Sequence, residues 1–275
     1  MRKGYSHAAR VIRLAEPKRT WASTRTPPMP LMDWAWFFDV DGTLIEIASS
    51  PTSVVVHHDL PNLIAQLYSL SGGAVSLITG RAVTDVDRFL PNAGISVAGQ
   101  HGLELRTADG KFIPASAVDA DFHHIGAALE VAAARHPGLL VEFKGESIAL
   151  HYRNAPRLAG YAHRLMRSLR DRHAPDFALR KGKRVVELTH HTADKGVALR
   201  KLMKTEPFKG RIPVFLGDDV TDESGFAVVN ELSGISIKVG PGPTLARWRL
   251  KDVTAVREWL RLGMESIMTE KAGNK

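Results

Sequence analysis

Two carboxylates stand one residue apart at the end of an apolar segment early in the chain. Residues 37–44 read Phe-Phe-Asp-Val-Asp-Gly-Thr-Leu, which is typical of a buried strand that runs into a turn. Side chains of an extended chain repeat every two residues, so Asp39 and Asp41 are expected to point the same way. Such a pair favours a hard cation such as Mg²⁺, which holds a phosphate while one aspartate attacks it. A strand followed by an ordinary Asp-Gly turn is the alternative for this segment alone.

Two further positions supply groups that suit a phosphate. Thr79-Gly80-Arg81 follows the apolar run 74–78 and places a hydroxyl and a backbone amide at the end of a second predicted strand. Lys195 begins a predicted helix, where the helix dipole disfavours a cation, so its position calls for an anionic partner. For Arg81, an ordinary arginine at the start of a helix is the plain alternative.

A second acidic cluster lies far along the chain. Residues 217–223 read Gly-Asp-Asp-Val-Thr-Asp-Glu and follow the apolar run 213–216. Four carboxylates within six residues are costly without a metal ion, because like charges disfavour one another's ionised form. The cluster therefore predicts a bound cation.

These segments, in this order, resemble the motifs of the haloacid-dehalogenase-like phosphatase superfamily, which are an Asp-x-Asp nucleophile loop, a Ser/Thr, a Lys and an acidic metal loop. Together with residues 99–104, Gly-Gln-His-Gly-Leu-Glu, they are similar to the bacterial type of the trehalose-6-phosphate phosphatase family. The similarity runs from about Trp34 to about Leu260. It implies an Mg²⁺-dependent enzyme that hydrolyses trehalose 6-phosphate, and a pathway link to a trehalose-6-phosphate synthase.

The resemblance also implies roles for single residues. Asp39 is expected to attack phosphorus and form an aspartyl-phosphate, while Asp41 protonates the leaving sugar oxygen and later deprotonates water. Thr79 and Lys195 are expected to orient and neutralise the phosphate oxygens. The implied Mg²⁺ ligands are Asp39, the backbone carbonyl of Asp41, Asp218 and, facing the metal's waters, Asp222; Asp219 is a further acidic neighbour. The implied substrate-binding residues are Thr79, Gly80, Arg81, His101, Glu142, Lys144, Glu187 and Lys195. For His101, a structural role is the alternative.

Composition limits the classes of protein that fit. The chain has 275 residues, of which 44% are hydrophobic, so it is long enough to bury a substantial core. It has no cysteine, which excludes disulfides, a thiol nucleophile and cysteine-ligated zinc. We find no apolar stretch long enough to span a bilayer and no signal-peptide segment, so we expect a cytoplasmic protein without a membrane partner.

The net charge of +8 suits an anionic substrate, but it also suits weak nucleic-acid binding. Much of this charge lies in residues 1–33, which are predicted to form a flexible basic arm that ends in the stiff proline-rich linker 26–30. A function for the arm, a start codon placed too early, and a purposeless extension stay open. Aromatic and basic residues do not interleave as in single-strand binders, so no nucleic-acid partner is expected.

Strands and helices alternate from Trp34 onward, which predicts an α/β fold with a doubly wound, mainly parallel sheet. Predicted strands at 35–38, 75–78, 96–98 and 214–216 deliver the motifs to one rim of this sheet. Helices are predicted at 59–70 and 83–90. The predicted catalytic core comprises residues 34–105 and 190–275.

Residues 106–189 are predicted to form an inserted α+β domain. A helix (119–136), a strand (139–143), a turn (144–146) and a strand (147–152) are followed by the same unit again, with a helix (156–172), a strand (177–180), a turn (181–182) and a strand (184–188). This repeat predicts a four-stranded antiparallel sheet with two helices on one face. The resemblance implies the same unit, a C2-type cap over the core.

Strand periodicity places Glu142 and Lys144 on the cap face that the helices leave uncovered, and Glu187 interrupts an apolar strand. Charges of a solvated sheet face are the plain alternative for all three. The resemblance implies instead that these residues bind the sugar hydroxyls, for which carboxylates are suited because each accepts several hydrogen bonds.

Two rival functions remain. One is a phosphatase of the same superfamily for another sugar phosphate, or a phosphomannomutase-like transferase, which would release little inorganic phosphate. The other is a catalytically idle protein whose basic arm holds an anionic partner. The intact set of Asp39, Asp41, Lys195 and Asp218 disfavours the second.

Overall fold

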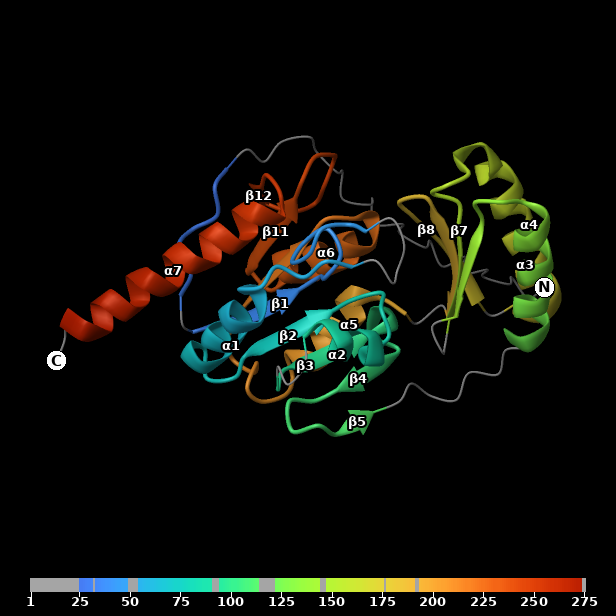
Figure 1. The fold of residues 1–275 in the computed structure, drawn as a ribbon. Helices are drawn as coiled ribbons and strands as arrows, with labels where there is room; N and C mark the ends of the chain where they lie inside the picture. Colours follow the sequence, from blue (N-terminus) through green and yellow to red (C-terminus); the bar gives the residue numbers. More distant parts are fainter. Residues whose placement is uncertain are drawn as a thin grey trace, which may run out of the picture.

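The computed structural model describes residues 25–31, 33–48, 54–90, 94–113, 122–143, 147–175, 177–190 and 193–273. Two sheets organise these residues, a larger one in the core and a smaller one in a lobe to its side (Figure 1). The core sheet has eight strands in the order β12 (Trp248–Leu250), β11 (Ile235–Val239), β10 (Ile212–Gly217), β1 (Trp34–Phe38), β2 (Val75–Ile78), β3 (Ser96–Gly99), β4 (Glu104–Arg106) and β5 (Phe112–Ile113).

Six neighbouring strands of the core sheet, from β12 to β3, run parallel. The central strand β1 consists of five apolar residues that are all buried, as expected for a strand covered on both faces. Trp36 and Phe38 pack into one cluster with residues of α1 (Leu60–Leu70), α2 (Val83–Phe89) and α7 (Val253–Gly273). Phe37, which points the other way, packs with α5 (Lys195–Leu202) and α6 (Glu223–Glu231). The predicted doubly wound α/β fold is confirmed.

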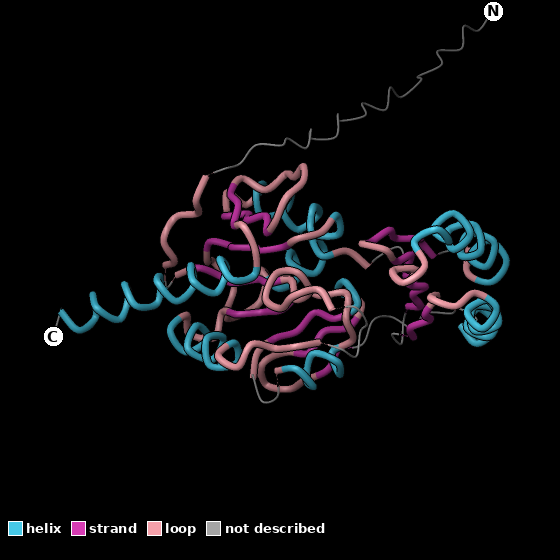
Figure 2. Tube along the Cα trace, turned by 45° about the horizontal axis from the view of Figure 1, so that its top comes forward, coloured by secondary structure: helices cyan, strands magenta, loops and turns pink. Residues whose placement is uncertain are grey.

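The smaller sheet has four antiparallel strands in the order β6 (Leu140–Phe143), β7 (Ser147–His151), β9 (Val185–His190) and β8 (Phe177–Gly182). Alternate apolar residues such as Ile148 and Leu188 pack against α3 (Phe122–Arg135) and α4 (Ala159–His173). The strands of this lobe lie towards the core, and its helices lie on the outer side (Figure 2). The uncovered face of the small sheet therefore faces the core.

Two details of the predicted domain organisation differ from the structure. The core sheet continues beyond the predicted boundary at Arg106, because β4 and β5 form an antiparallel hairpin on its edge. Asp109-Gly110 lies in the turn of this hairpin. In the second unit of the cap, the turn is not Lys181-Gly182 but Lys183-Arg184, where Arg184 has a φ of +67°. Gly182 belongs to β8, so the turn predicted from this glycine lies two residues before the observed turn.

Three short 3₁₀ helices complete the described elements, at Gln100–Gly102, Pro156–Leu158 and Val220–Asp222. No helix among the described residues is long and apolar enough to cross a membrane.

The end of the predicted basic arm is attached to the core. Residues 1–24 lie outside the described residues, but 25–31 run along α7 and β12. The indole Nε1 of Trp259 donates a hydrogen bond to the carbonyl of Pro28 over 3.1 Å. Pro30 lies so close to Gly263 that a Cβ there would come within 2.2 Å of its ring. The predicted proline-rich linker at 26–30 thus packs against the core.

Deleting residues 1–31 is expected to leave the turnover implied by the resemblance nearly unchanged but to lower the free energy of unfolding by about 1–3 kcal/mol. The loss comprises the hydrogen bond to Trp259 and the burial of the proline rings. Urea denaturation measures it, with the deletion of residues 1–24 as the control that keeps both contacts. Equal stability of the two deletions would refute the expectation, as would a large loss of turnover in a folded variant.

Candidate active site

The loop after β1 packs closely against the second acidic cluster, at residues 217–223. The carbonyl of Val40 accepts hydrogen bonds from the backbone N–H groups of Leu44 and Ile45, at 2.9 and 3.1 Å, which closes a tight turn. Gly42 has a φ of +82°, and a Cβ on it would lie 2.2 Å from Oδ2 of Asp218. Only glycine fits both the conformation and the space. The loop therefore lies directly on the end of β10.

Lys195 is buried between two carboxylates. Its Nζ lies 2.7 Å from Oδ1 of Asp39 and 2.6 Å from Oδ1 of Asp222. Lys195 is the first residue of α5, and Asp194 caps this helix by accepting a hydrogen bond from the N–H of Val197 at 3.0 Å. Burial leaves all three charges without water, so they depend on one another for solvation.

Asp39, Asp218 and Asp222 form a group that suits a cation. One carboxylate oxygen of each lies within 4.8 Å of the others, and all three residues are buried. Asp222 is held in place because its Oδ2 accepts the backbone N–H of Asp219 at 2.8 Å. Three carboxylate oxygens from two strand ends are the donor set that Mg²⁺ prefers, so the residues fit the predicted metal.

The charges of this group do not balance. Burial, and then the charge of Asp222, raise the pKa of Asp39 well above its usual value, against the opposing effect of Lys195. Burial likewise raises the pKa of Asp218. For Lys195, burial alone would lower the pKa, but Asp222 and Asp39 more than offset it and raise the pKa. An excess of buried negative charge remains, which a divalent cation would relieve.

Thr79 and His101 lie beside this group at the ends of β2 and β3. Thr79 is buried, and its backbone N–H donates to the carbonyl of Ala98 at 2.9 Å. His101 has a φ of +58° and donates its backbone N–H to the carbonyl of Thr79 at 2.8 Å. The imidazole passes so close to Gly80 that a Cβ there would lie 2.8 Å from the ring. Because Gly80 has no side chain, there is room for the imidazole of His101 in the cavity.

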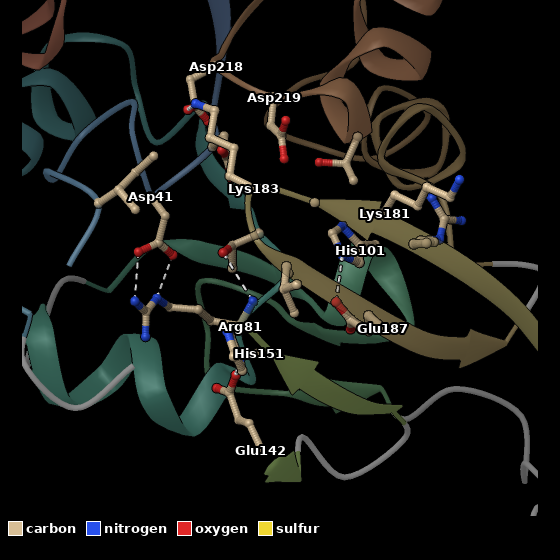
Figure 3. Close-up of a pocket in the computed structure, with 18 of the residues that line it drawn as sticks. Asp41, Arg81, His101, Glu142, His151, Lys181, Lys183, Glu187, Asp218 and Asp219 are labelled. Carbon is tan, nitrogen blue, oxygen red and sulfur yellow. Dashed lines mark hydrogen bonds and ion pairs between the residues drawn. The ribbon is translucent and has the colours of Figure 1, made fainter. Parts of the chain in front are cut away.

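The cap contributes the opposite wall of the same cavity (Figure 3). Glu187 is buried, accepts a hydrogen bond from the hydroxyl of Ser147 at 2.8 Å, and has its Oε2 3.8 Å from Nε2 of His101. Glu142 lies 2.7 Å from Nε2 of His151. Lys183, in the β8–β9 turn, forms an ion pair with Asp218 of the core. The described cavity is therefore lined by both lobes.

Most of the predicted site residues line this cavity together, which are Asp39, Asp41, Thr79, Gly80, Arg81, His101, Glu142, Glu187, Lys195 and Asp218. Asp222 lies behind them, against Lys195. Two side chains have other partners than predicted, because Asp41 and Arg81 pair with each other. Lys144 lies outside the described residues.

Sequence reasoning missed five basic residues of the lining, namely His151, Arg153, Arg180, Lys181 and Lys183. A signal existed for His151, because Ser147, Ala149 and His151 alternate with apolar residues and so share the uncovered face of β7. Arg180 shares a face with Glu187, its cross-strand partner. The role of Lys183 depends on the displaced turn and could not be read locally.

Known proteins show the same combination of fold and motifs. The sequence profile described as trehalose-phosphatase matches residues 37–254. The trehalose-6-phosphate phosphatase of Escherichia coli K12 is 41% identical over 256 residues, which cover 92% of this chain and 94% of that protein. The C-terminal domain of the C. albicans trehalose-6-phosphate phosphatase has a similar fold, with a TM-score of 0.76 at 22% identity, covering 88% of this chain and 99% of that one. A haloacid dehalogenase-like hydrolase from Bacteroides thetaiotaomicron has a TM-score of 0.60 at 12% identity, covering 82% and 97%.

The parallel sheet, with a smaller antiparallel sheet above the ends of its strands, is the fold of the haloacid dehalogenase-like proteins. The profile matches residues 37–254, which are most of this chain. This match shows that the chain belongs to the trehalose-phosphatase family of enzymes. The resemblance expected from the sequence is confirmed.

Proposed function

We propose that this enzyme hydrolyses trehalose 6-phosphate to trehalose and inorganic phosphate with the help of Mg²⁺. The observation that carries the proposal is one cavity that joins two sets of groups. Asp39, Lys195 and Asp218 of the core suit a phosphate and its metal, and Glu142 and Glu187 of the cap suit sugar hydroxyls. The family to which the chain belongs supports the same substrate.

Asp39 is the proposed nucleophile. Its carboxylate attacks phosphorus, the bond from phosphorus to the sugar oxygen breaks, and an aspartyl-phosphate forms. Water then attacks this intermediate and frees Asp39 as phosphate leaves. Lys195 fixes one oxygen of Asp39 through their 2.7 Å contact and, with the hydroxyl of Thr79, places positive charge and a donor beside the phosphate.

Asp39, Asp218 and Asp222, together with the backbone carbonyl of Asp41, would hold Mg²⁺. When bound, the ion would neutralise charge on the phosphate oxygens and on the buried carboxylates. Asp41 exchanges the protons, giving one to the leaving sugar oxygen and later taking one from the attacking water.

The cap residues are proposed to select the sugar. Glu142, Ala149 and Glu187 are register partners across three neighbouring strands, so they form one row on the face that looks towards the core. The small side chain of Ala149 leaves space between two carboxylates. Each of these carboxylates accepts more than one hydrogen bond, which suits the neighbouring hydroxyls of a sugar ring.

A panel of sugar phosphates, assayed for phosphate release with and without Mg²⁺, tests the function. We expect the highest kcat/KM for trehalose 6-phosphate, and loss of activity with EDTA that added Mg²⁺ restores. A higher kcat/KM for another sugar phosphate, or transfer of phosphate to a second hydroxyl without release, would reject the substrate or the reaction. Full turnover in metal-free buffer would reject the metal.

Asp39→Asn is expected to abolish turnover while the protein stays folded, because an amide is not a nucleophile for phosphorus. The amide also keeps the shape of the side chain beside Lys195. Steady-state phosphate release and thermal unfolding measure the two properties. A variant that still releases phosphate at the wild-type rate would show that the nucleophile lies elsewhere.

Glu187→Ala is expected to lower kcat/KM for trehalose 6-phosphate about ten- to a hundred-fold, because a hydrogen bond to a charged group contributes about 1.5–3 kcal/mol. Hydrolysis of 4-nitrophenyl phosphate, which has no sugar, should fall much less. Ser147→Ala is the matched control, since it removes the hydroxyl that Glu187 binds within the cap and keeps the carboxylate. Equal losses on both substrates in a folded variant would contradict a role of Glu187 in sugar selection.

A further inference from the structure

Arg81 binds the side chain of Asp41 with both arms of its guanidinium group. Nε donates to Oδ2 at 2.5 Å, and a terminal nitrogen donates to Oδ1 at 2.6 Å (Figure 3). Two parallel hydrogen bonds from one planar group fix the plane of the carboxylate as well as its distance. A carboxylate has about four lone-pair sites, so two stay open for the proton that Asp41 exchanges.

Arg81 is itself held by the core. The side chain of Arg81 is only 10% exposed, and its guanidinium lies 4.8 Å from the ring centroid of Phe89. The backbone N–H of Arg81 donates to Oγ1 of Thr79 at 3.2 Å, and its carbonyl accepts the N–H of Gln100 at 2.9 Å. The guanidinium is therefore a rigid support for Asp41, whose own side chain is 32% exposed towards the cavity.

We propose that Arg81 is the positioning residue for Asp41, because its guanidinium holds the carboxylate at the place from which Asp41 exchanges protons. The inference rests on the proposed phosphatase function and refines it.

In the first half-reaction the Asp39–phosphorus bond forms and the phosphorus–sugar bond breaks. The electron pair of the broken bond stays on the sugar oxygen, which takes the proton of Asp41. In the second, water attacks phosphorus, the Asp39–phosphorus bond breaks, and the proton of the water passes to Asp41. Both transfers need the carboxylate at one place, which the guanidinium fixes.

Arg81→Gln tests the inference through the leaving group. The sugar oxygen is a poor leaving group that needs a proton, whereas 4-nitrophenolate leaves without one. A misplacement of about 1 Å costs up to ~10²-fold in rate. In the first half-reaction, measured as single-turnover release of the alcohol, we therefore expect the rate on the sugar phosphate to fall about ten- to a hundred-fold and the rate on 4-nitrophenyl phosphate to fall less than about threefold, because the second half-reaction is common to both substrates. Arg88→Gln is the matched control, because Arg88 is an exposed arginine of α2, the helix that follows Arg81, and pairs with Asp85.

Two further measurements separate positioning from binding of the phosphate by Arg81. In an Asp41→Asn background, Arg81→Gln should change the residual rate less than about twofold, because residues that act through one another are not additive. Inhibition by inorganic phosphate should be unchanged in Arg81→Gln. A rise in KM for both substrates, weaker phosphate inhibition, or additive losses would overturn the inference and assign Arg81 to the phosphate.

Arg81→Lys controls for a folding defect, because it keeps the positive charge but cannot make two parallel hydrogen bonds to Asp41. In the first half-reaction it should show the same selective loss on the sugar phosphate. A loss in Arg81→Lys that is equal on both substrates in this step would overturn positioning. The comparison uses the sugar phosphate that the wild-type enzyme turns over fastest. Failure on trehalose 6-phosphate alone therefore concerns the proposed substrate and not Arg81, whereas absence of any phosphatase activity would overturn both.

Discussion

A buried ammonium group between two carboxylates sets the geometry of the catalytic rim. Lys195 contacts Asp39 at the end of β1 and Asp222 in the loop after β10. Removing one member of such a buried set would leave charges without a partner, which costs about 3–5 kcal/mol. The first turn of α5 is therefore held at the junction of two neighbouring strands. The excess negative charge that remains, with Asp218, is the physical basis for a metal at this place.

Strand periodicity decides what the cap presents to this rim. Cross-strand partners share a face, so Glu142, Ala149, Glu187 and Arg180 form one row across the small sheet. The apolar residues between them point to the helices on the other side. The same alternation thus stabilises the cap and supplies its polar wall. A slip of one residue in any strand would turn its member of the row into the apolar core of the cap.

The cap and the rim meet through charged pairs. Lys183 of the cap pairs with Asp218, and His101 of the core lies near Glu187. Polar groups of this cavity thus have partners across the two lobes. Charge interactions are strongest where water is excluded, so the approach of the cap affects the charged groups at the ends of the core strands.

The sequence by itself determined the core of the site. An apolar run that ends in carboxylate or hydroxyl side chains identifies the end of a strand. In a parallel sheet all such ends meet at one edge. Asp39, Thr79, Lys195 and Asp218 could therefore be placed together before any coordinates. The strands of the core and the repeated unit of the cap followed from periodicities of 2 and 3.6 residues. Boundaries were less certain, as the hairpin at β4 and β5 shows, because its polar turn resembles a linker.

Only the tertiary structure decided which of these groups touch one another. The sequence placed Asp41 and Arg81 near a phosphate but did not show that they bind each other, and it gave no partner for Lys183. Local periodicity fixes the face on which a side chain lies. The distance between two faces depends on how the cap packs over the core, which is set by contacts between residues far apart in the chain. For that reason the side chains that meet at the rim could be predicted, while the pairing across the cavity could not.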